Sequence, residues 1–240
     1  MLGKLKRLVK KLIYSYRCDG ETYVAHLKKC GVDVGERVRI FDPLSTIIDI
    51  TRPFMIKIGN DVQIAAGVTI LTHGYDWSVL KGLYNEVSGS CSEVVIGDNC
   101  FIGMHTTILK GVHIGKNCII GANSLVNKDI PDNWVAAGNP AKPIMPVEEY
   151  YKKRKDAQLG EAKELYRCYV NRFGKEPDID KFDEFFWLFQ ERKKESLTQG
   201  QLSKMKLVGT YEKSLEKFLG EDGMFKNFHE FLEYMRKEVK

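Results

Sequence analysis

A six-residue period runs through the middle of the chain and constrains its fold more than any other feature. From residue 96 the sequence divides into consecutive hexads whose first position is always aliphatic: Ile96, Ile102, Ile108, Ile114, Ile120 and Val126. The fifth position is small or β-branched: Cys100, Thr106, Val112, Cys118, Ser124 and Ile130. Period two alone would indicate ordinary strands. Period six requires a short strand that turns after each hexad and directs the same side chain inward each time.

The same period extends upstream with less regularity. One phase contains Val38, Leu44, Ile50, Ile56, Val62 and Val68, and a second contains Ile58, Ile64 and Ile70. Thr46 and Arg52 interrupt the pattern, so the first coils are expected to be irregular or to contain a bulge. Three hexads close a triangular coil, and the coils stack about 4.8 Å apart. Each coil then buries its aliphatic side chains against its neighbours.

A specific stretch follows the last hexads. Residues 120–144 read IGANSLVNKDIPDNWVAAGNPAKPI. Together with the hexads, this stretch resembles the hexapeptide-repeat acyltransferases, in particular the galactoside, maltose and serine acetyltransferase group and sugar O-acetyltransferases of surface-polysaccharide biosynthesis. The resemblance implies a mainly β fold, a left-handed parallel β-helix, over residues 31–145. Its handedness comes from the resemblance alone, because crossovers between parallel strands are usually right-handed.

The regions that flank the coil lack its period. Residues 1–30 are predicted to form an N-terminal helical segment, and residues 1–16 have a basic amphipathic pattern. Such a helix can lie on an anionic membrane or pack on the coil or a partner subunit. Residues 146–240 are predicted to form a C-terminal α-helical region with helical patterns over 147–174, 177–194 and 222–240. An aromatic stripe there is expected in the core: Phe182, Phe185, Phe186 and Phe189.

Composition excludes several classes of protein. A net charge of +5 is too small to indicate nucleic-acid binding, although a few converging cations would suit an anionic small ligand. The chain has no run of about 18 apolar residues that would predict a transmembrane helix. Lysines interrupt the first segment too often for a signal-peptide core, so a cytoplasmic protein is expected. Its six cysteines lack zinc spacing and should be free thiols.

Residues 71–95 form an excursion from the coil, because Ile70 and Ile96 are not separated by a multiple of six. Functional residues concentrate on loops that a rigid scaffold positions. The excursion begins ILTHGYDW, and His73 matches the exit position of the catalytic histidine in the resembled enzymes. A neutral imidazole can take the proton of an acceptor hydroxyl during its attack on a thioester. Such general-base catalysis is typically worth ~10²–10⁴-fold.

Two further histidines, His105 and His113, raise the question of a metal. The fold also occurs in a carbonic-anhydrase-like family that binds zinc through three histidines. Where that family has histidines in its IGH and LHG turns, this chain has Met104 and Lys110. No metal is therefore predicted.

The resemblance also implies a donor, an acceptor and an assembly. Acetyl-CoA would be the donor, in a groove between subunits of a homotrimer lined by Gly103, Met104, Gly121, Ala122, Asn127, Lys128 and Lys142. Many relatives have a serine, thought to assist the oxyanion, where this chain has Met104, so the oxyanion donor is left open. An aromatic face flanked by carboxylates suits a sugar, and the acceptor candidates are Asp49, Tyr75, Asp76, Trp77 and Tyr84. Asp76 could instead hold the imidazole, and Arg52 could pair with Asp49.

These features predict an acetyl-CoA-dependent O-acetyltransferase that acts on a sugar hydroxyl by direct transfer, in surface-polysaccharide biosynthesis. A peripheral contact with the inner membrane surface through residues 1–16 fits lipid-linked sugars. Transfer to an amino sugar or a xenobiotic, transfer from an acyl carrier protein, and a non-catalytic solenoid scaffold are the alternatives.

Overall fold

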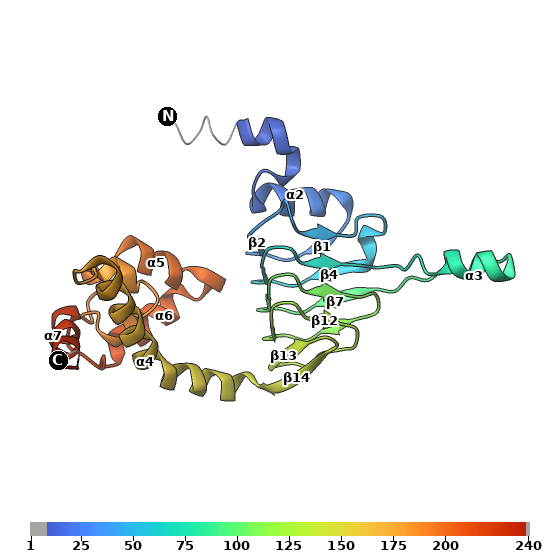
Figure 1. The fold of residues 1–240 in the computed structure, drawn as a ribbon. Coiled ribbons are helices and arrows are strands. Elements are labelled where there is room, and N and C mark those ends of the chain that lie inside the picture. Colours follow the sequence, from blue (N-terminus) through green and yellow to red (C-terminus); the bar gives the residue numbers. More distant parts are fainter. Residues whose placement is uncertain (1–8, 239–240) are drawn as a thin grey trace. The chain divides into compact units, whose positions relative to one another are not determined.

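The computed structural model describes residues 9–238. It divides into two units, Met1–Tyr150 and Tyr151–Lys240, and each is described by itself (Figure 1).

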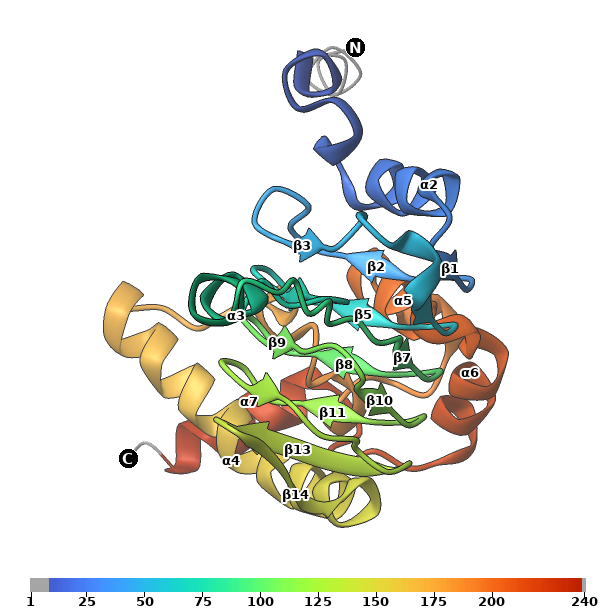
Figure 2. The same ribbon diagram turned by 90° about the vertical axis from the view of Figure 1, so that its right-hand side faces the viewer.

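Three sheets of short strands form the first unit, and successive turns of the chain stack as coils (Figures 1 and 2). Sheet A contains β1 (Asp33–Val34), β4 (Ile56–Ile58), β7 (Val94–Ile96) and β10 (His113–Ile114). Sheet B contains β2 (Arg39–Ile40), β5 (Gln63–Ile64), β8 (Phe101–Ile102), β11 (Ile119–Ile120), β13 (Trp134–Gly138) and β14 (Ala141–Pro146). Sheet C contains β3 (Ile47–Ile48), β6 (Thr69–Ile70), β9 (Thr107–Ile108) and β12 (Leu125–Val126). Only β13 and β14 pair antiparallel among these strands of the described chain.

The hexad residues form the core of this unit. In sheet C, for example, Ile48, Ile70, Ile108 and Val126 stack in register and are buried. Cys100 and Cys118 are buried free thiols in successive coils. The predicted mainly β fold, a left-handed parallel β-helix with helical segments at both ends, is confirmed.

Asparagines form the corner between sheets A and B. Asn99, Asn117 and Asn133 have φ values of 55°, 56° and 63°, a left-handed conformation that asparagine tolerates better than most residues. Their side chains also bond from coil to coil: the Asn99 amide donates to Asn117 at 2.9 Å, and the Asn117 amide donates to Asn133 at 2.8 Å. The corner is therefore fixed by both its backbone and its side chains.

The first coil departs from the predicted phase. Leu44 and Ile50, expected to point inward, are exposed, whereas Thr46 and Ile48 are buried. The reason is an insertion: the inward residues Ile40 and Ile48 are eight positions apart, not six. The next inward strand residue, Ile56, follows directly after a turn that contains the 3-10 helix η2 (Pro53–Met55).

The excursion protrudes from the coil between β6 and β7 and carries the helix α3 (Trp77–Tyr84) near its tip (Figure 1). None of the residues of α3 is buried, and Val79, Leu83 and Tyr84 are each more than 60% exposed.

The N-terminal segment closes the first end of the coil. After residues 9–14, which are helical, come η1 (Ser15–Arg17) and α2 (Gly20–Cys30). Tyr23 and Leu27 of α2 are buried in the core of the coil. Three apolar residues of the predicted amphipathic pattern, Val9, Leu12 and Ile13, are exposed, and residues 1–8 lie outside the described residues. Over the described part of the chain, no helix has the length and apolar character needed to cross a membrane.

The second unit is helical. It contains most of α4 (Val147–Phe173), then α5 (Gln199–Met205), α6 (Tyr211–Gly220) and α7 (Phe228–Glu238), with 3-10 helices η3 (Ile179–Phe182), η4 (Phe186–Leu188), η5 (Lys194–Ser196) and η6 (Leu207–Gly209). The helix predicted over 177–194 is wrong, because the chain forms separate 3-10 turns there. These turns direct Phe182 and Phe189 into one core cluster and Phe186 into another. The helices α5 and α6 were not predicted.

Candidate active site

The excursion begins and ends in an antiparallel pairing that fixes the backbone of His73. The Gly74 amide donates to the Ser90 carbonyl at 3.1 Å, and the Ser92 amide donates to the Thr72 carbonyl at 3.0 Å. His73 and Cys91 lie opposite each other between these two bonds. The histidine is therefore held by the edge of the coil and by the returning strand of the loop.

The His73 ring is oriented by a buried carboxylate. Nδ1 of His73 lies 2.7 Å from Oδ2 of Asp49, and the two side chains are 22% and 4% exposed. An ionised carboxylate can only accept hydrogen bonds, so Nδ1 carries the proton in the neutral ring. The lone pair of Nε2 is then available as a base.

Two threonines surround the same carboxylate. The Thr51 amide and hydroxyl donate to Oδ1 of Asp49 at 3.0 Å and 2.6 Å. The Thr72 amide donates to Oδ2 at 3.1 Å, and the Thr72 hydroxyl donates to the same oxygen. Burial is the largest influence and raises the pKa of Asp49, but the hydrogen bonds from Thr51 and Thr72 together lower this pKa well below its usual range. Asp49 is therefore ionised at neutral pH.

The predicted acceptor residues separate into two groups. Asp49 lies beneath His73 with both oxygens engaged, so its carboxylate does not face an acceptor. No ion pair joins it to Arg52 among the residues with described positions. Asp76 does not hold the imidazole, since Asp49 occupies that position; its carboxylate lies against Gly74, where an added side chain would collide with it.

The aromatic candidates lie on the loop side of the histidine. The rings of Tyr75 and Trp77 are 5.1 Å apart, and the rings of His73 and Tyr75 are 6.3 Å apart. Tyr75 is 69% exposed. Tyr84 is also exposed, at the far end of α3. The structure thus brings Tyr75 and Trp77 together beside His73 as an open aromatic surface.

One group of predicted donor residues lies at the corner between sheets B and C. Gly103 and Met104 follow β8, and Gly121 and Ala122 follow β11. A Cβ at Gly103 would come within 2.6 Å of the Ala122 amide nitrogen, so the stacking of these turns requires glycine. Lys142 is exposed on β14, in sheet B.

The other two donor candidates lie elsewhere. Asn127 and Lys128 follow β12 at the corner between sheets C and A, where His73 also leaves the coil. Both are exposed. Within one chain, the predicted donor residues therefore occupy two corners and do not form one continuous groove.

The three histidines of the β-helix do not converge. His73 lies at the corner between sheets C and A, His105 at the corner between sheets B and C, and His113 on the outer face of sheet A. No group of three or more metal-ligating side chains occurs among the described residues.

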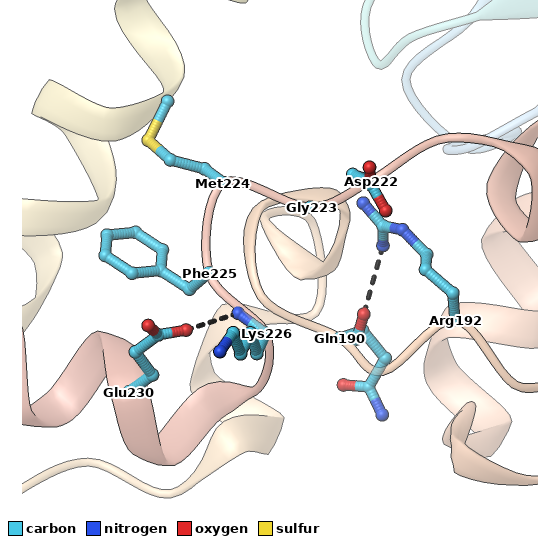
Figure 3. A pocket seen from close by; sticks show the side chains of 8 residues that line it. All are labelled: Gln190, Arg192, Asp222, Gly223, Met224, Phe225, Lys226 and Glu230. Atoms are coloured by element: carbon cyan, nitrogen blue, oxygen red, sulfur yellow. Dashed lines mark hydrogen bonds between the residues drawn. The ribbon is translucent and has the colours of Figure 1, made fainter.

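The helical unit has a hollow on its surface, and the charged residue Arg192 in its wall has a structural role (Figure 3). Arg192 is partly buried, and burial lowers the pKa of its guanidinium. The guanidinium donates to the carbonyls of Trp187, Gln190 and Glu221 at 2.6, 3.1 and 2.7 Å. Arg192 thus joins three backbone segments of this unit.

The sequence analysis missed the partners of His73. Thr51, Thr72 and Cys91 were not singled out, and Asp49 was assigned to the acceptor. Strand register would have revealed the pair, since Ile48 pairs with Ile70 and the residues that follow them are therefore neighbours. That register is hidden in the sequence, because these two positions are 22 residues apart instead of the regular 18.

Comparison with known proteins places this fold and site in a family. Residues 93–128 match the family model described as bacterial transferase hexapeptide (six repeats). Galactoside O-acetyltransferase of Escherichia coli is 39% identical over 104 residues, which cover 43% of this chain and about half (49%) of the relative. A solved maltose O-acetyltransferase of Clostridium difficile is 30% identical with a TM-score of 0.41, covering 60% of this chain and 87% of that one.

The match to a further relative extends over a larger share of that relative's length. Protein CapG of Staphylococcus aureus is 41% identical over 127 residues, which cover 53% of this chain and 73% of CapG. With the repeat, the stacked coils and the family model, this likeness is sufficient to assign the family. The chain belongs to the hexapeptide-repeat acyltransferases.

Proposed function

We propose that this protein is an acetyl-CoA-dependent O-acetyltransferase that acts on a sugar hydroxyl, with His73 as general base. The observation that carries the proposal is the contact of 2.7 Å between Asp49 and Nδ1 of His73 at the exit of the coil. It leaves Nε2 as the basic nitrogen of a ring whose position is fixed by both the coil and the loop.

The proposed reaction is a direct transfer. Nε2 of His73 takes the proton of the acceptor hydroxyl while its oxygen attacks the thioester carbonyl carbon of acetyl-CoA. The tetrahedral intermediate collapses with cleavage of the C–S bond, and the departing CoA thiolate takes the proton from the imidazolium. Asp49 stabilises that imidazolium and keeps the ring in one tautomer, without itself accepting the proton.

The acceptor is proposed to be a sugar because of the open aromatic pair beside the base. Tyr75 and Trp77 offer apolar faces of the size of a sugar ring, and the exposed carboxylate of Asp76 can accept hydrogen bonds from its hydroxyls. Named relatives act on sugars: a galactoside in one case and maltose in another. A role in surface-polysaccharide biosynthesis, with a peripheral membrane contact through residues 1–16, extends this proposal.

The donor site is proposed to lie between subunits of a homotrimer. The predicted donor residues occupy two corners of one chain, so a groove lined by both is completed only when one corner faces the other corner of a second copy. Lys128 and Lys142 are both exposed cations suited to the phosphates of CoA. Similar solved structures include a serine acetyltransferase in complex with CoA.

The test uses acetyl-CoA with a panel of methyl glycosides and amino sugars. CoA release is followed by chromatography, because Cys91 and Cys168 are exposed and would react with thiol reagents. His73→Ala should lower kcat by ~10²-fold or more, while acetyl-CoA binding by calorimetry and the Tm stay close to wild type. His113→Ala, on the outer face of sheet A, is the matched control and should retain activity.

The alternatives give different results in the same assay. A faster reaction with an amino group would indicate an N-acetyltransferase. A protein that binds no acetyl-CoA would indicate a scaffold. Retained activity in His73→Ala would show that the base lies elsewhere.

A further inference from the structure

We infer that Thr51 and Thr72 are positioning residues: they hold the Asp49 carboxylate in the orientation from which it fixes the tautomer of His73. The inference rests on the proposed function, since it concerns the same base. It adds two side chains that do not touch the reacting atoms to the machinery of the site.

The geometry assigns one threonine to each carboxylate oxygen. Oδ1 of Asp49 accepts from the amide and hydroxyl of Thr51, and Oδ2 accepts from the amide and hydroxyl of Thr72. Oδ2 also contacts Nδ1 of His73 at 2.7 Å. With two donors on Oδ1 and three on Oδ2, the carboxylate cannot rotate about its Cβ–Cγ bond without breaking hydrogen bonds on both sides. The Thr51 hydroxyl also lies 3.4 Å from Nδ1 of His73, so it contacts both members of the pair.

The two threonines come from successive coils. Thr51 lies in the turn after β3, and Thr72 follows β6, one coil later. Strands β3 and β6 are paired, with Ile48 opposite Ile70. The hydrogen bonds from Thr51 and Thr72 to Asp49 therefore depend on the register of the two coils. Through Asp49, that register sets the orientation of the imidazole.

The same hydrogen bonds moderate the charge that His73 meets. Four donors from the two threonines disperse the negative charge of Asp49, so the charge that faces Nδ1 of His73 is smaller than that of an unsatisfied carboxylate. The other titratable groups that face this part of the site are Tyr75 and Asp76 on the loop, Cys91 on the returning strand and Lys110 on the next coil. None of these is changed when a threonine hydroxyl is removed.

The experiment compares isosteric valine variants. Thr72→Val and Thr51→Val each remove one hydroxyl donor and keep the backbone donor. Thr46→Val is the matched control: Thr46 is a fully buried coil threonine, and its hydroxyl has no hydrogen-bond partner within the described structure. Thr72→Ser, which keeps the hydroxyl, tests for rescue, and the Tm of every variant reports folding.

Activity and NMR give separate readouts. With acetyl-CoA and the best methyl glycoside of the panel, each positioning variant should lose about tenfold or more in kcat, with little change in the KM for acetyl-CoA. In protein labelled with ¹⁵N-histidine, the wild-type His73 should be in the Nδ1–H tautomer, and the Thr51→Val, Thr72→Val double variant should lose this single tautomer. Thr72→Ser should restore most of each property.

The outcomes separate this inference from the proposed function. If His73→Ala inactivates the enzyme while Thr51→Val and Thr72→Val behave like Thr46→Val in rate and tautomer, the positioning role is refuted and the base remains. If His73→Ala is active, the proposed function fails first. Should Thr72→Val not fold, Thr51→Val decides, because Thr51 is exposed and its substitution disturbs no buried packing.

Discussion

Thr46→Val should stabilise the protein, although threonine-to-valine changes in a core often do not. Thr46 is fully buried, and its Oγ1 has no hydrogen-bond partner among the described residues. An unsatisfied buried hydroxyl costs about 1–3 kcal/mol, and valine fills the same volume with a methyl group. The bonded groups of Thr46 belong to its backbone: the carbonyl accepts from Arg17 at 3.1 Å and Tyr23 at 3.5 Å, and the amide donates to the Asp42 carbonyl at 3.2 Å. The substitution keeps all three bonds.

A second threonine in the same inward column provides the control. Thr106 is equally buried, but its hydroxyl donates to the Gly121 carbonyl at 3.2 Å. Thr106→Val should therefore destabilise the protein by about 0.5–1.5 kcal/mol, the usual net worth of such a bond. The two variants have the same chemistry and burial and differ only in whether the hydroxyl has a partner.

Scanning calorimetry measures both changes. For a protein of this size, 1 kcal/mol corresponds to about 2–4 °C in Tm. Thr46→Val should therefore raise the Tm of the β-helix transition by about 2–12 °C, and Thr106→Val should lower it by about 1–6 °C. A fall in Tm for Thr46→Val as large as that for Thr106→Val would refute the reasoning, since it would show that the Thr46 hydroxyl is satisfied.

Three further predictions concern charge and assembly. The pKa of Asp49 is lower in the folded protein than in the unfolded chain, so its ionisation stabilises the fold above about pH 4, and this contribution is lost as the pH falls further. In urea titrations, the difference in unfolding free energy between wild type and Asp49→Asn should be constant from pH 5 to 8 and shrink below pH 4. A difference that grows below pH 4 would contradict this. The double variant Lys128→Ala, Lys142→Ala should raise the KM for acetyl-CoA more than it lowers kcat, with a smaller effect at high salt because exposed charges are screened; unchanged affinity would mean that the donor groove lies elsewhere. Light scattering should give a trimer, and a mass near the 27.5 kDa of one chain would refute the shared donor site.

The regular coils could be predicted from the sequence because each inward position repeats a local rule. From Ile96 to Val126 every predicted inward aliphatic residue is buried. The rule fails where residues are inserted, which is why Leu44 and Ile50 were expected inside and lie outside. The position of His73 at the root of the loop could be predicted because the interruption of the period marks the loop exit. Its partner Asp49 could not, because the offset of 22 residues between their coils depends on the structure of the irregular turns.

The helical unit shows a different limit of sequence patterns. The phenylalanines between 182 and 189 were correctly expected in a core, since burial of large apolar side chains does not depend on the element that carries them. The prediction of a continuous helix was wrong. Phe182 and Phe186 belong to different core clusters, whereas one face of a single helix would direct both into the same cluster.

Because of the antiparallel pairing at the root of the excursion, the segment between Gly74 and Ser90 could be replaced as a unit. Both ends of this segment are anchored by backbone hydrogen bonds, which are independent of side-chain identity. His73 and Asp49 lie on the coil side of the anchor, and the aromatic surface and α3 lie on the other side. We therefore expect that loops of different length and composition can be grafted between these two anchors to change the proposed acceptor surface, while the His73–Asp49 pair stays in place.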